Sequence, residues 1–324
     1  MKPSNIGGQA VMEGIMMRHK DKYSIAVRRP DKEIEIKVED YKCTFGKSPI
    51  WKKPLLRGVA GFVDSLVVGT KCLMYSAEIA GDEEDEAEAA KMAAMTEEEK
   101  AKKKAKEDKL FKLLLYVTVA VSIVFSVGLF MLLPYVIASG LRLLGASEIL
   151  ITIVEAFVKL ALFIGYMFLM SRMKDIQRTF MYHGAEHKCI NCVENGMPLT
   201  VENVMKSSRQ HRRCGTSFLF LVMLVSIFLH FIFVLVPGYW VRLFGRLLMV
   251  PVVAGISFEI IQWAGRTDSK FAKIMSMPGF AMQKLTTIEP TEDMVEVAIK
   301  AVEAVFDWRA YLKEEFNLEV EEEQ

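Results

Sequence analysis

Three residues near the middle of the chain have the types and the spacing of a metal site. His183 and His187 are four positions apart, so on a helix both imidazoles point to the same side and can bind one ion. Glu186 lies one helical turn after His183, close enough to polarise a metal-bound water. The string His-x-x-Glu-His is the inverted form of a zinc-enzyme motif. It predicts that zinc lowers the pKa of a bound water and that Glu186 is the catalytic base.

Two residues further along the chain are candidates for the third metal ligand. His211 and Cys214 stand in the string His-Arg-Arg-Cys, and either side chain can complete the site while a fourth position stays open for water or substrate. The alternative is a loop whose histidines cap helix ends or bind backbone carbonyls, because Gly184 weakens the assumption of a helix. These residues do not decide whether the metal is catalytic or structural.

The cysteines offer a second interpretation of the same region. Cys189 and Cys192 form a Cys-x-x-Cys pair, which can join His211 and Cys214 in a closed structural zinc site with no position for chemistry. A redox function of the pair is disfavoured, because the sequence around it lacks a βαβ pattern. The chain has five cysteines, an odd number, and we expect reduced thiols rather than a disulfide framework.

Charged and polar residues elsewhere are further candidates. Glu13, in a Gly-rich N-terminal stretch, can approach the metal or one of its ligands; alternatively it flanks a turn and faces solvent or an arginine. Glu259 lies in an apolar segment, where a carboxylate is costly and either faces the protein interior or snorkels to the membrane surface. We expect Glu155 and Lys159 to form an internal ion pair and His230 to pack between helices.

The segments that must position these residues include membrane spans. The 29 residues from Leu113 to Leu141 contain no charged side chain, and neither do the 28 residues from Cys214 to Val241. Because about 20 apolar residues cross a bilayer as a helix, these runs predict an integral membrane protein. The 324 residues carry 41 basic and 40 acidic side chains, and this net charge of +1 argues against nucleic-acid binding through bulk electrostatics.

We predict a mainly α-helical, polytopic membrane protein with about four transmembrane helices, a small N-terminal β-rich cytoplasmic lobe and a C-terminal amphipathic helix. The four spans are expected at about 111–137, 149–171, 217–236 and 243–265. The predicted organisation is an N-terminal lobe (1–54), an amphipathic, membrane-associated helix (55–80), a charged linker (81–110), the first two spans (111–171), a cytoplasmic loop with the candidate metal site (172–216), the last two spans (217–265) and a cytoplasmic tail with a helix (266–324).

Lysines and arginines set the predicted orientation. Seven lie between Lys100 and Lys112 and eight between Arg172 and Arg213, whereas the segments on the opposite side carry three arginines. By the positive-inside rule, both termini and the central loop face the cytoplasm of a multi-pass protein in the plasma membrane.

Local patterns predict the elements of the two soluble parts. Tyr23–Arg28 and Glu33–Val38 alternate apolar with polar residues, which is typical of strands, and the turn between them contains Pro30. Gly7-Gly8 indicates another turn. A helix with an apolar stripe is expected after Thr291, a plausible N-cap.

Four motifs carry a resemblance to a known family. They are Gly7–Arg18 (GGQAVMEGIMMR), Tyr182–Lys188 (YHGAEHK), His211–Phe218 (HRRCGTSF) and Gln283–Pro290 (QKLTTIEP). With them the chain resembles the YqhQ-like family, a group of uncharacterised bacterial multi-pass membrane proteins described as predicted metal-dependent enzymes. The resemblance spans nearly the whole chain except the linker.

The resemblance implies a membrane location and a metal site, but no known reaction. The site residues that it implies are His183, Glu186, His187, His211 and Cys214. Cys189 and Cys192 are not fixed parts of the family's pattern, which favours the histidine-centred site over the closed one.

Three functions follow as hypotheses. The first is a zinc-dependent hydrolase at the cytoplasmic face of the membrane, with a membrane-associated substrate that is either peptide or lipid-linked. The second is a non-enzymatic scaffold or assembly factor with a structural metal. The third is a small transporter, which is weakest because four spans without visible repeats give little framework for alternating access unless the protein oligomerises. The expected partners are the lipid bilayer and this substrate, with no nucleic acid.

Overall fold

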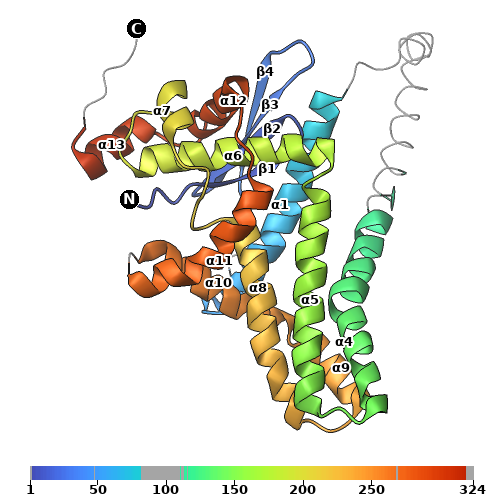
Figure 1. Cartoon of the computed structure of the whole chain (residues 1–324). Coiled ribbons are helices and arrows are strands. Elements are labelled where there is room, and N and C mark those ends of the chain that lie inside the picture. Colours follow the sequence, from blue (N-terminus) through green and yellow to red (C-terminus); the bar gives the residue numbers. More distant parts are fainter. Residues whose placement is uncertain are drawn as a thin grey trace, which may run out of the picture. The chain divides into compact units, whose positions relative to one another are not determined.

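The computed structural model of the chain describes residues 2–46, 48–81, 110, 113–114, 116–267 and 269–318. It is mainly helical, with a small antiparallel sheet near the N-terminus (Figure 1). The predicted charged linker at 81–110 lies outside the described residues apart from its two ends. The chain divides into two compact units: unit 1 comprises Met1–Gly81, Gly165–Phe233 and Phe244–Gln324, and unit 2 comprises Asp82–Ile164 and Val234–Leu243.

The sheet of unit 1 is a simple meander. Its strands are β1 (Gly7–Val11), β2 (Gly14–His19), β3 (Lys22–Arg28) and β4 (Ile34–Asp40), and each pairs antiparallel with the next. β3 and β4 coincide with the strands that the alternating pattern predicts. Gly7 and Gly8 form part of β1 rather than a turn; the turn that follows lies at Met12 and Glu13.

Both faces of the sheet are covered by helices of unit 1. Ile15, Met17 and Ala26 face a core that includes residues of α6 (Lys174–Glu194) and α12 (Glu292–Glu303). Met16, Ile25 and Val27 point to the other side, where α1 (Leu56–Ala80) packs. This alternation is the period of two that a strand imposes on its side chains. The N-terminal strands are therefore the middle layer of a helix–sheet–helix arrangement.

The remaining helices of unit 1 follow α6 along the chain. They are α7 (Val201–Lys206), α8 (Gly215–His230), α10 (Val250–Arg266), α11 (Lys270–Thr286) and α13 (Trp308–Phe316), while α9 (Tyr239–Leu248) begins in unit 2. α8, α10 and α11 pack against one another, and α10 also packs against α1. Arg57 and Glu259 form a bidentate ion pair at that contact, and Gly58 and Gly255 allow the two helices to approach closely.

Four helices of the described residues are long and apolar enough to cross a membrane: Leu56–Ala80, Tyr116–Leu144, Glu148–Met170 and Gly215–Leu235. Three of them match predicted spans, although the predicted beginning of the first span falls outside the described residues. The predicted fourth span, 243–265, falls on two helices, α9 and α10, which together are long and apolar enough to cross a membrane but are bent by 43° where they meet. Pro251 in the first turn of α10 explains the break, since its ring is incompatible with a continuing helix. The sequence predicts an amphipathic, membrane-associated helix at 55–80, and the corresponding α1 is also long and apolar enough to cross a membrane.

Unit 2 contains the helix Tyr116–Leu144 and most of α5 (Glu148–Met170). A π-helical stretch at Gly128–Leu132 ends two residues before Pro134, where a regular helix would lack a backbone donor. Where the two helices connect, the Glu148 carboxylate accepts hydrogen bonds from Arg142 at 3.0 and 3.1 Å and also pairs with Arg242. The sequence predicts Arg142, Arg242 and Arg246 on the side of the membrane opposite the cytoplasm. The Glu148 carboxylate pairs with the first two of them.

Replacing Ile15 by alanine should destabilise unit 1. The side chain is fully buried between the sheet and the helices, so the substitution leaves a cavity that costs about 2–5 kcal/mol. Thermal unfolding of detergent-purified protein should show a melting temperature lowered by several degrees. Ile36→Ala is the matched control, because that β4 side chain is 42% exposed and its loss should leave the melting temperature almost unchanged. Equal effects of the two substitutions would contradict the assigned register of the sheet.

Candidate metal centre

α6 carries three of the candidate site residues and remains regular through Gly184. A Cβ at residue 184 would overlap the carbonyl oxygen of Ile288, so glycine is needed where the segment Thr286–Pro290 crosses the helix. The backbone N–H of Ile288 donates to the Phe180 carbonyl at 3.0 Å and fixes this crossing. The glycine that weakens the prediction of a helix is therefore explained by a close tertiary contact.

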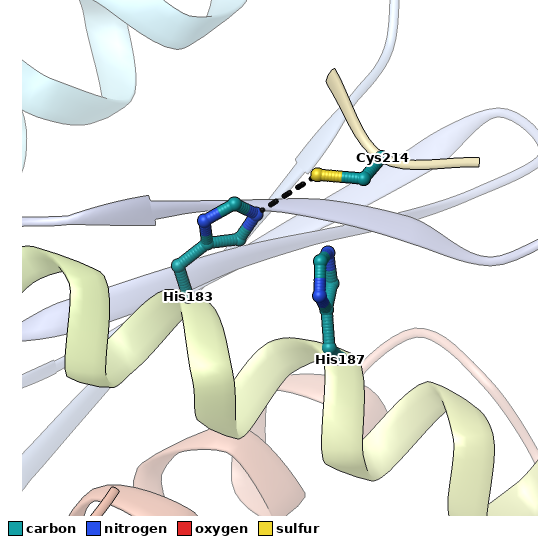
Figure 2. Close-up of side chains that lie close together, drawn as sticks. All are labelled: His183, His187 and Cys214. Carbon is teal, nitrogen blue, oxygen red and sulfur yellow. Dashed lines mark hydrogen bonds between the residues drawn. The ribbon is translucent and has the colours of Figure 1, made fainter. Parts of the chain in front are cut away.

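His183, His187 and Cys214 come together in unit 1 (Figure 2). Their nearest ligand atoms all lie within 4.8 Å of one another, and His183 Nε2 is 3.2 Å from Cys214 Sγ. The two imidazoles project from successive turns of α6 toward the thiol, which lies on a different segment of the chain. The sequence spacing predicts this convergence of the histidines, and of its two options for the third residue the structure brings Cys214 into the cluster.

Backbone carbonyls orient both imidazoles. Nδ1 of His183 lies 2.9 Å from the carbonyl oxygen of Thr286, and Nδ1 of His187 lies 2.7 Å from that of Arg209. A carbonyl only accepts hydrogen bonds, so each Nδ1 must donate, and Nε2 is the nitrogen of each ring that is left for a metal. In His183 this nitrogen faces the Cys214 thiol. Metal-binding histidines are oriented in this way by the partner of their second nitrogen.

Cys214 is the N-cap residue of α8 and is almost completely buried. Burial alone would raise the pKa of its thiol, but His183 and His187 beside it lower that pKa well below its usual range. Burial would likewise lower the pKa of His183, but the neighbouring Cys214 raises it to about 9. The pair therefore favours a thiolate, the form of cysteine that binds metals.

Glu186 is buried beside the two histidines, against the backbone of β1. The Gly8 N–H donates to its Oε1 at 3.1 Å, and a Cβ on Gly8 would lie only 3.1 Å from the carboxyl carbon. Burial raises the pKa of Glu186, while the charges of His183 and His187 oppose that shift. A strand containing glycine thus brings a backbone donor to the proposed catalytic base.

Gln283 positions the loop that carries Cys214, and sequence reasoning does not identify it. Its side-chain amide donates to the His211 carbonyl and to Ser217 Oγ, both at 2.7 Å, and its Oε1 accepts from the His211 N–H at 2.8 Å. The side chain is fully buried in α11. A glutamine within the motif QKLTTIEP, at the end of an apolar stretch, is the only signal for it in the sequence.

α6 also binds the end of α7 and the irregular segment between α7 and Cys214. Lys188 Nζ donates to the Met205 carbonyl at 2.6 Å. Asn191 Nδ2 donates to the carbonyls of Ser208 and Gln210 at 2.6 and 2.9 Å. These bonds satisfy carbonyls that no regular element pairs.

His211, the other option for the third ligand, is not a member of the cluster, although its ring centre lies 5.6 Å from that of His187. Its Nε2 lies 3.6 Å from Glu194 Oε2, and both residues are buried. Glu194 also accepts hydrogen bonds from the backbone N–H and hydroxyl of Ser4 at 2.7 and 2.8 Å and pairs with Arg213. Burial would raise the pKa of Glu194, but His211 and Arg213 lower it to about 2.

The remaining sequence candidates lie outside the cluster. Glu13 forms an ion pair with Arg178 and accepts from the Tyr182 hydroxyl at 3.3 Å. Glu259 pairs with Arg57 on α1, as described above. Cys189 and Cys192 are buried in the core that α6 shares with α12, and Cys192 Sγ donates to the Pro198 carbonyl at 3.4 Å, so neither joins Cys214.

The donor set fits a zinc ion. Two imidazole nitrogens and one thiolate are ligands that zinc prefers, and tetrahedral zinc separates its nitrogen and sulfur ligands by about 3.4–3.8 Å. In the cluster, His183 Nε2 and Cys214 Sγ are 3.2 Å apart, and all three ligand atoms lie within 4.8 Å of one another. Among the described residues these three are the only group of His, Cys, Asp and Glu side chains that converges in this way, and three ligands leave one position of a tetrahedron open.

Comparison with known proteins identifies relatives without assigning a reaction. The family described as "Protein of unknown function (DUF1385)" matches residues 53–308. The "Uncharacterized protein YqhQ" of Bacillus subtilis (strain 168) is 38% identical over 306 residues, which cover 92% of this chain and 91% of the relative. No solved structure matches the chain. These findings confirm the resemblance that the four sequence motifs indicate.

Gly184→Ala should distort the site by displacing the segment Thr286–Pro290. The added methyl group overlaps the Ile288 carbonyl, a backbone atom that cannot rotate away, so we expect a loss of about 1–3 kcal/mol and a lower melting temperature. Gly165→Ala, in α5, is the control, because nothing lies within 4 Å of its Cβ position and alanine favours a helix. A Gly184→Ala protein as stable as the control would show that the segment Thr286–Pro290 does not approach α6 closely enough to exclude a side chain at residue 184.

Proposed function

The chain belongs to the DUF1385 family, and from its metal centre we propose that it is an integral membrane protein with zinc-dependent hydrolase activity at the cytoplasmic face of the membrane. The observation that carries the proposal is the convergence of one ligand atom each from His183, His187 and Cys214 beside the buried side chain of Glu186. A site with three ligands and an adjacent acid–base group suits hydrolysis better than a closed four-ligand site does.

In this proposal each residue has a defined task. His183, His187 and Cys214 would hold the ion, which when bound would lower the pKa of a water molecule and polarise the scissile group. Glu186 would act as the acid–base group that accepts a proton from the attacking water and donates it to the leaving group. The Gly8 N–H binds Oε1 of Glu186 and so restrains the carboxyl group beside the two histidines. Thr286 and Arg209 hold the imidazoles through their carbonyls.

Membrane insertion is part of the proposal. The helix Tyr116–Leu144 buries none of its most apolar stretch against the rest of the protein, which suits a helix that faces lipid. The distribution of lysine and arginine supports a plasma-membrane protein with both termini in the cytoplasm. We assign α12 as the amphipathic helix of the cytoplasmic lobe, because Val297 and Ala301 are buried while Glu296 and Lys300 are exposed.

A structural metal in a scaffold or assembly factor is the second candidate. The observation that favours it is burial: His187, Cys214 and Glu186 are 1%, 4% and 5% exposed. A closed environment is common for structural zinc. The two candidates differ in the requirement for Glu186, which only hydrolysis needs.

Elemental analysis of the purified protein tests the metal. We expect about one zinc per chain in the wild type and its loss in His183→Ala and His187→Ala, since each variant removes one of three ligands. His19→Ala is the matched control: this histidine lies on β2, against Phe306, and its loss should leave the zinc content unchanged. A zinc-free wild-type preparation from replete medium would remove both candidates together.

Glu186→Gln separates the two candidates. Glutamine keeps the shape and the acceptor for the Gly8 N–H but cannot take a proton, so zinc should be retained while cellular function is lost. The measurement is zinc content together with complementation of a deletion strain. If Glu186→Gln complements while His183→Ala does not, the metal is structural.

Reporter fusions test the orientation. A fluorescent protein fused after the C-terminus should be fluorescent if that end lies in the cytoplasm. The same reporter does not fold into its fluorescent form when the general secretory route exports it. Alkaline phosphatase inserted at Gly145–Ser147 should be active, and the same insertion at Ser208 inactive. The reverse pattern would place the metal centre outside the cell.

A further inference from the structure

One side of α11 is exposed along most of the helix. The apolar side chains there are large, and Phe271, Ile274 and Met277 are 62%, 60% and 63% exposed. The exposed residues follow the spacing of helical turns, so they share one side of α11. They are Lys270, Phe271, Lys273, Ile274, Met277 and Lys284.

The opposite side of α11 is buried and supports the metal centre. Gln283 binds both backbone groups of His211, and the Thr286 carbonyl accepts from Nδ1 of His183. A Cβ at Gly279 would overlap the Ser217 side chain, so α11 lies directly against α8. The same helix therefore has one side committed to the site and one side available to a partner.

The exposed side of α11 is both apolar and basic. The helix contains three lysines and no aspartate or glutamate. With 3.6 residues per turn, the lysines lie to one side of Met277, and Ile274 and Phe271 lie to the other. Among the residues that the structure describes, no carboxylate pairs with these lysines. Their charge is thus available to an anionic partner.

An aromatic pair extends the apolar half of this surface onto α10. The ring of Trp263 lies 5.8 Å from that of Phe271, measured between centroids, and the Trp263 residue is 43% exposed. Tryptophan is enriched where a membrane meets water, because its ring is apolar while its N–H is polar.

The chain holds the start of α11 close to the end of α10. Three residues separate the two helices, and three residues reach at most about 11 Å. α9 and α10 together are long and apolar enough to cross a membrane. In the orientation proposed above, α10 ends at the cytoplasmic leaflet, whose surface potential is negative.

This composition fits a lipid surface better than a protein partner. Lysine is depleted in protein–protein interfaces, whereas a helix with lysines on one half and phenylalanine and isoleucine on the other is typical of the lipid head-group region.

We propose that α11 lies in the head-group region of the cytoplasmic leaflet, with Phe271 and Ile274 toward the acyl chains and its three lysines on the phosphates of anionic lipids. The contact rests on the membrane insertion that is part of the proposed function, and it needs neither zinc nor Glu186.

Quenching of a single fluorophore tests the contact in the full-length protein. Nitrobenzoxadiazole is attached to Ile274→Cys in nanodiscs of phosphatidylcholine and phosphatidylglycerol. The background carries Cys43→Ser, because the other four cysteines are buried. The control label is at Ile36→Cys, an exposed apolar position of β4. Compared with this control, we expect doxyl-labelled lipids to quench the α11 label roughly threefold more and aqueous iodide to quench it roughly threefold less.

Two results of this experiment would overturn the proposal. Iodide quenching that is equal at the two positions would mean that this side of α11 faces water. Protection of the Ile274→Cys label from both quenchers would mean that a protein covers it, such as a second copy of this chain.

The lysines are tested by the class of lipid that carries the doxyl group. We expect doxyl phosphatidylglycerol to quench the Ile274→Cys label about twofold more than doxyl phosphatidylcholine does, because lysines attract anionic lipids. The triple variant Lys270→Gln/Lys273→Gln/Lys284→Gln should bring this ratio to about one. Equal quenching by the two lipids with all three lysines present contradicts the proposal.

A second triple variant is the matched control. Lys20→Gln/Lys22→Gln/Lys32→Gln removes the same charge from exposed positions of the sheet and should leave the ratio unchanged. An equal fall of the ratio in both triple variants would show an effect of net charge alone and would overturn the assignment to α11.

Two further labels separate this proposal from the proposed function. Val124→Cys, at a 72% exposed position of the helix Tyr116–Leu144, should be quenched by doxyl lipids. Lipid quenching there, with iodide quenching at Ile274→Cys, would overturn the α11 contact while membrane insertion stands. Iodide quenching at both positions would contradict both. Addition of His183→Ala should remove zinc and leave the quenching at Ile274→Cys unchanged, so failure of the hydrolase does not affect this test.

Discussion

Where the segment Thr286–Pro290 crosses α6, the Ile288 carbonyl occupies the space that a side chain on residue 184 would need. This close crossing brings the Thr286 carbonyl to Nδ1 of His183 at 2.9 Å and places Thr286 Oγ1 3.2 Å from Thr216, whose hydroxyl contacts the Cys214 thiol. One backbone contact therefore fixes an imidazole, and through two hydroxyl groups it also reaches the thiol that completes the cluster. A wider separation of the two segments would remove both effects together.

The same helix must also stabilise an irregular segment within a buried environment. The end of α7 and the residues that follow it up to Arg213 present backbone carbonyls that neither a helix nor a strand pairs, and an unpaired buried carbonyl costs about 1–3 kcal/mol. Lys188 and Asn191 of α6 bind three of these carbonyls, and Gln283 of α11 binds both backbone groups of His211. Polar residues in the core thus replace the missing secondary structure, and the position of Cys214 follows from them.

Local patterns in the sequence predict part of this arrangement. The alternation in β3 and β4 and the spacing of His183 and His187 depend on neighbouring residues, and the structure has both strands and the paired imidazoles. Contacts between distant residues are not visible in such patterns. Glu13 pairs with Arg178, 165 residues away, and Glu259 with Arg57, 202 residues away, so neither carboxylate belongs to the cluster. The sequence pattern places Gly8 in a turn and makes Gly184 unfavourable for a helix, whereas Gly8 lies in a strand and Gly184 in a regular helix. At each position another segment of the chain approaches too closely for a side chain, and such contacts are seen only in the folded chain.

Cys214 joins the cluster to an apolar helix. The residue is at once a member of the cluster and the cap of α8, the first helix after the loop that is apolar enough to span a bilayer. Two other segments cover the cluster. β1 lies against Glu186 at Gly8, and the segment Thr286–Pro290 lies against His183. These contacts leave the end of α8 as the part of the site that adjoins an apolar helix. In the proposed function, a substrate held in the bilayer would therefore approach the cluster from the side of α8.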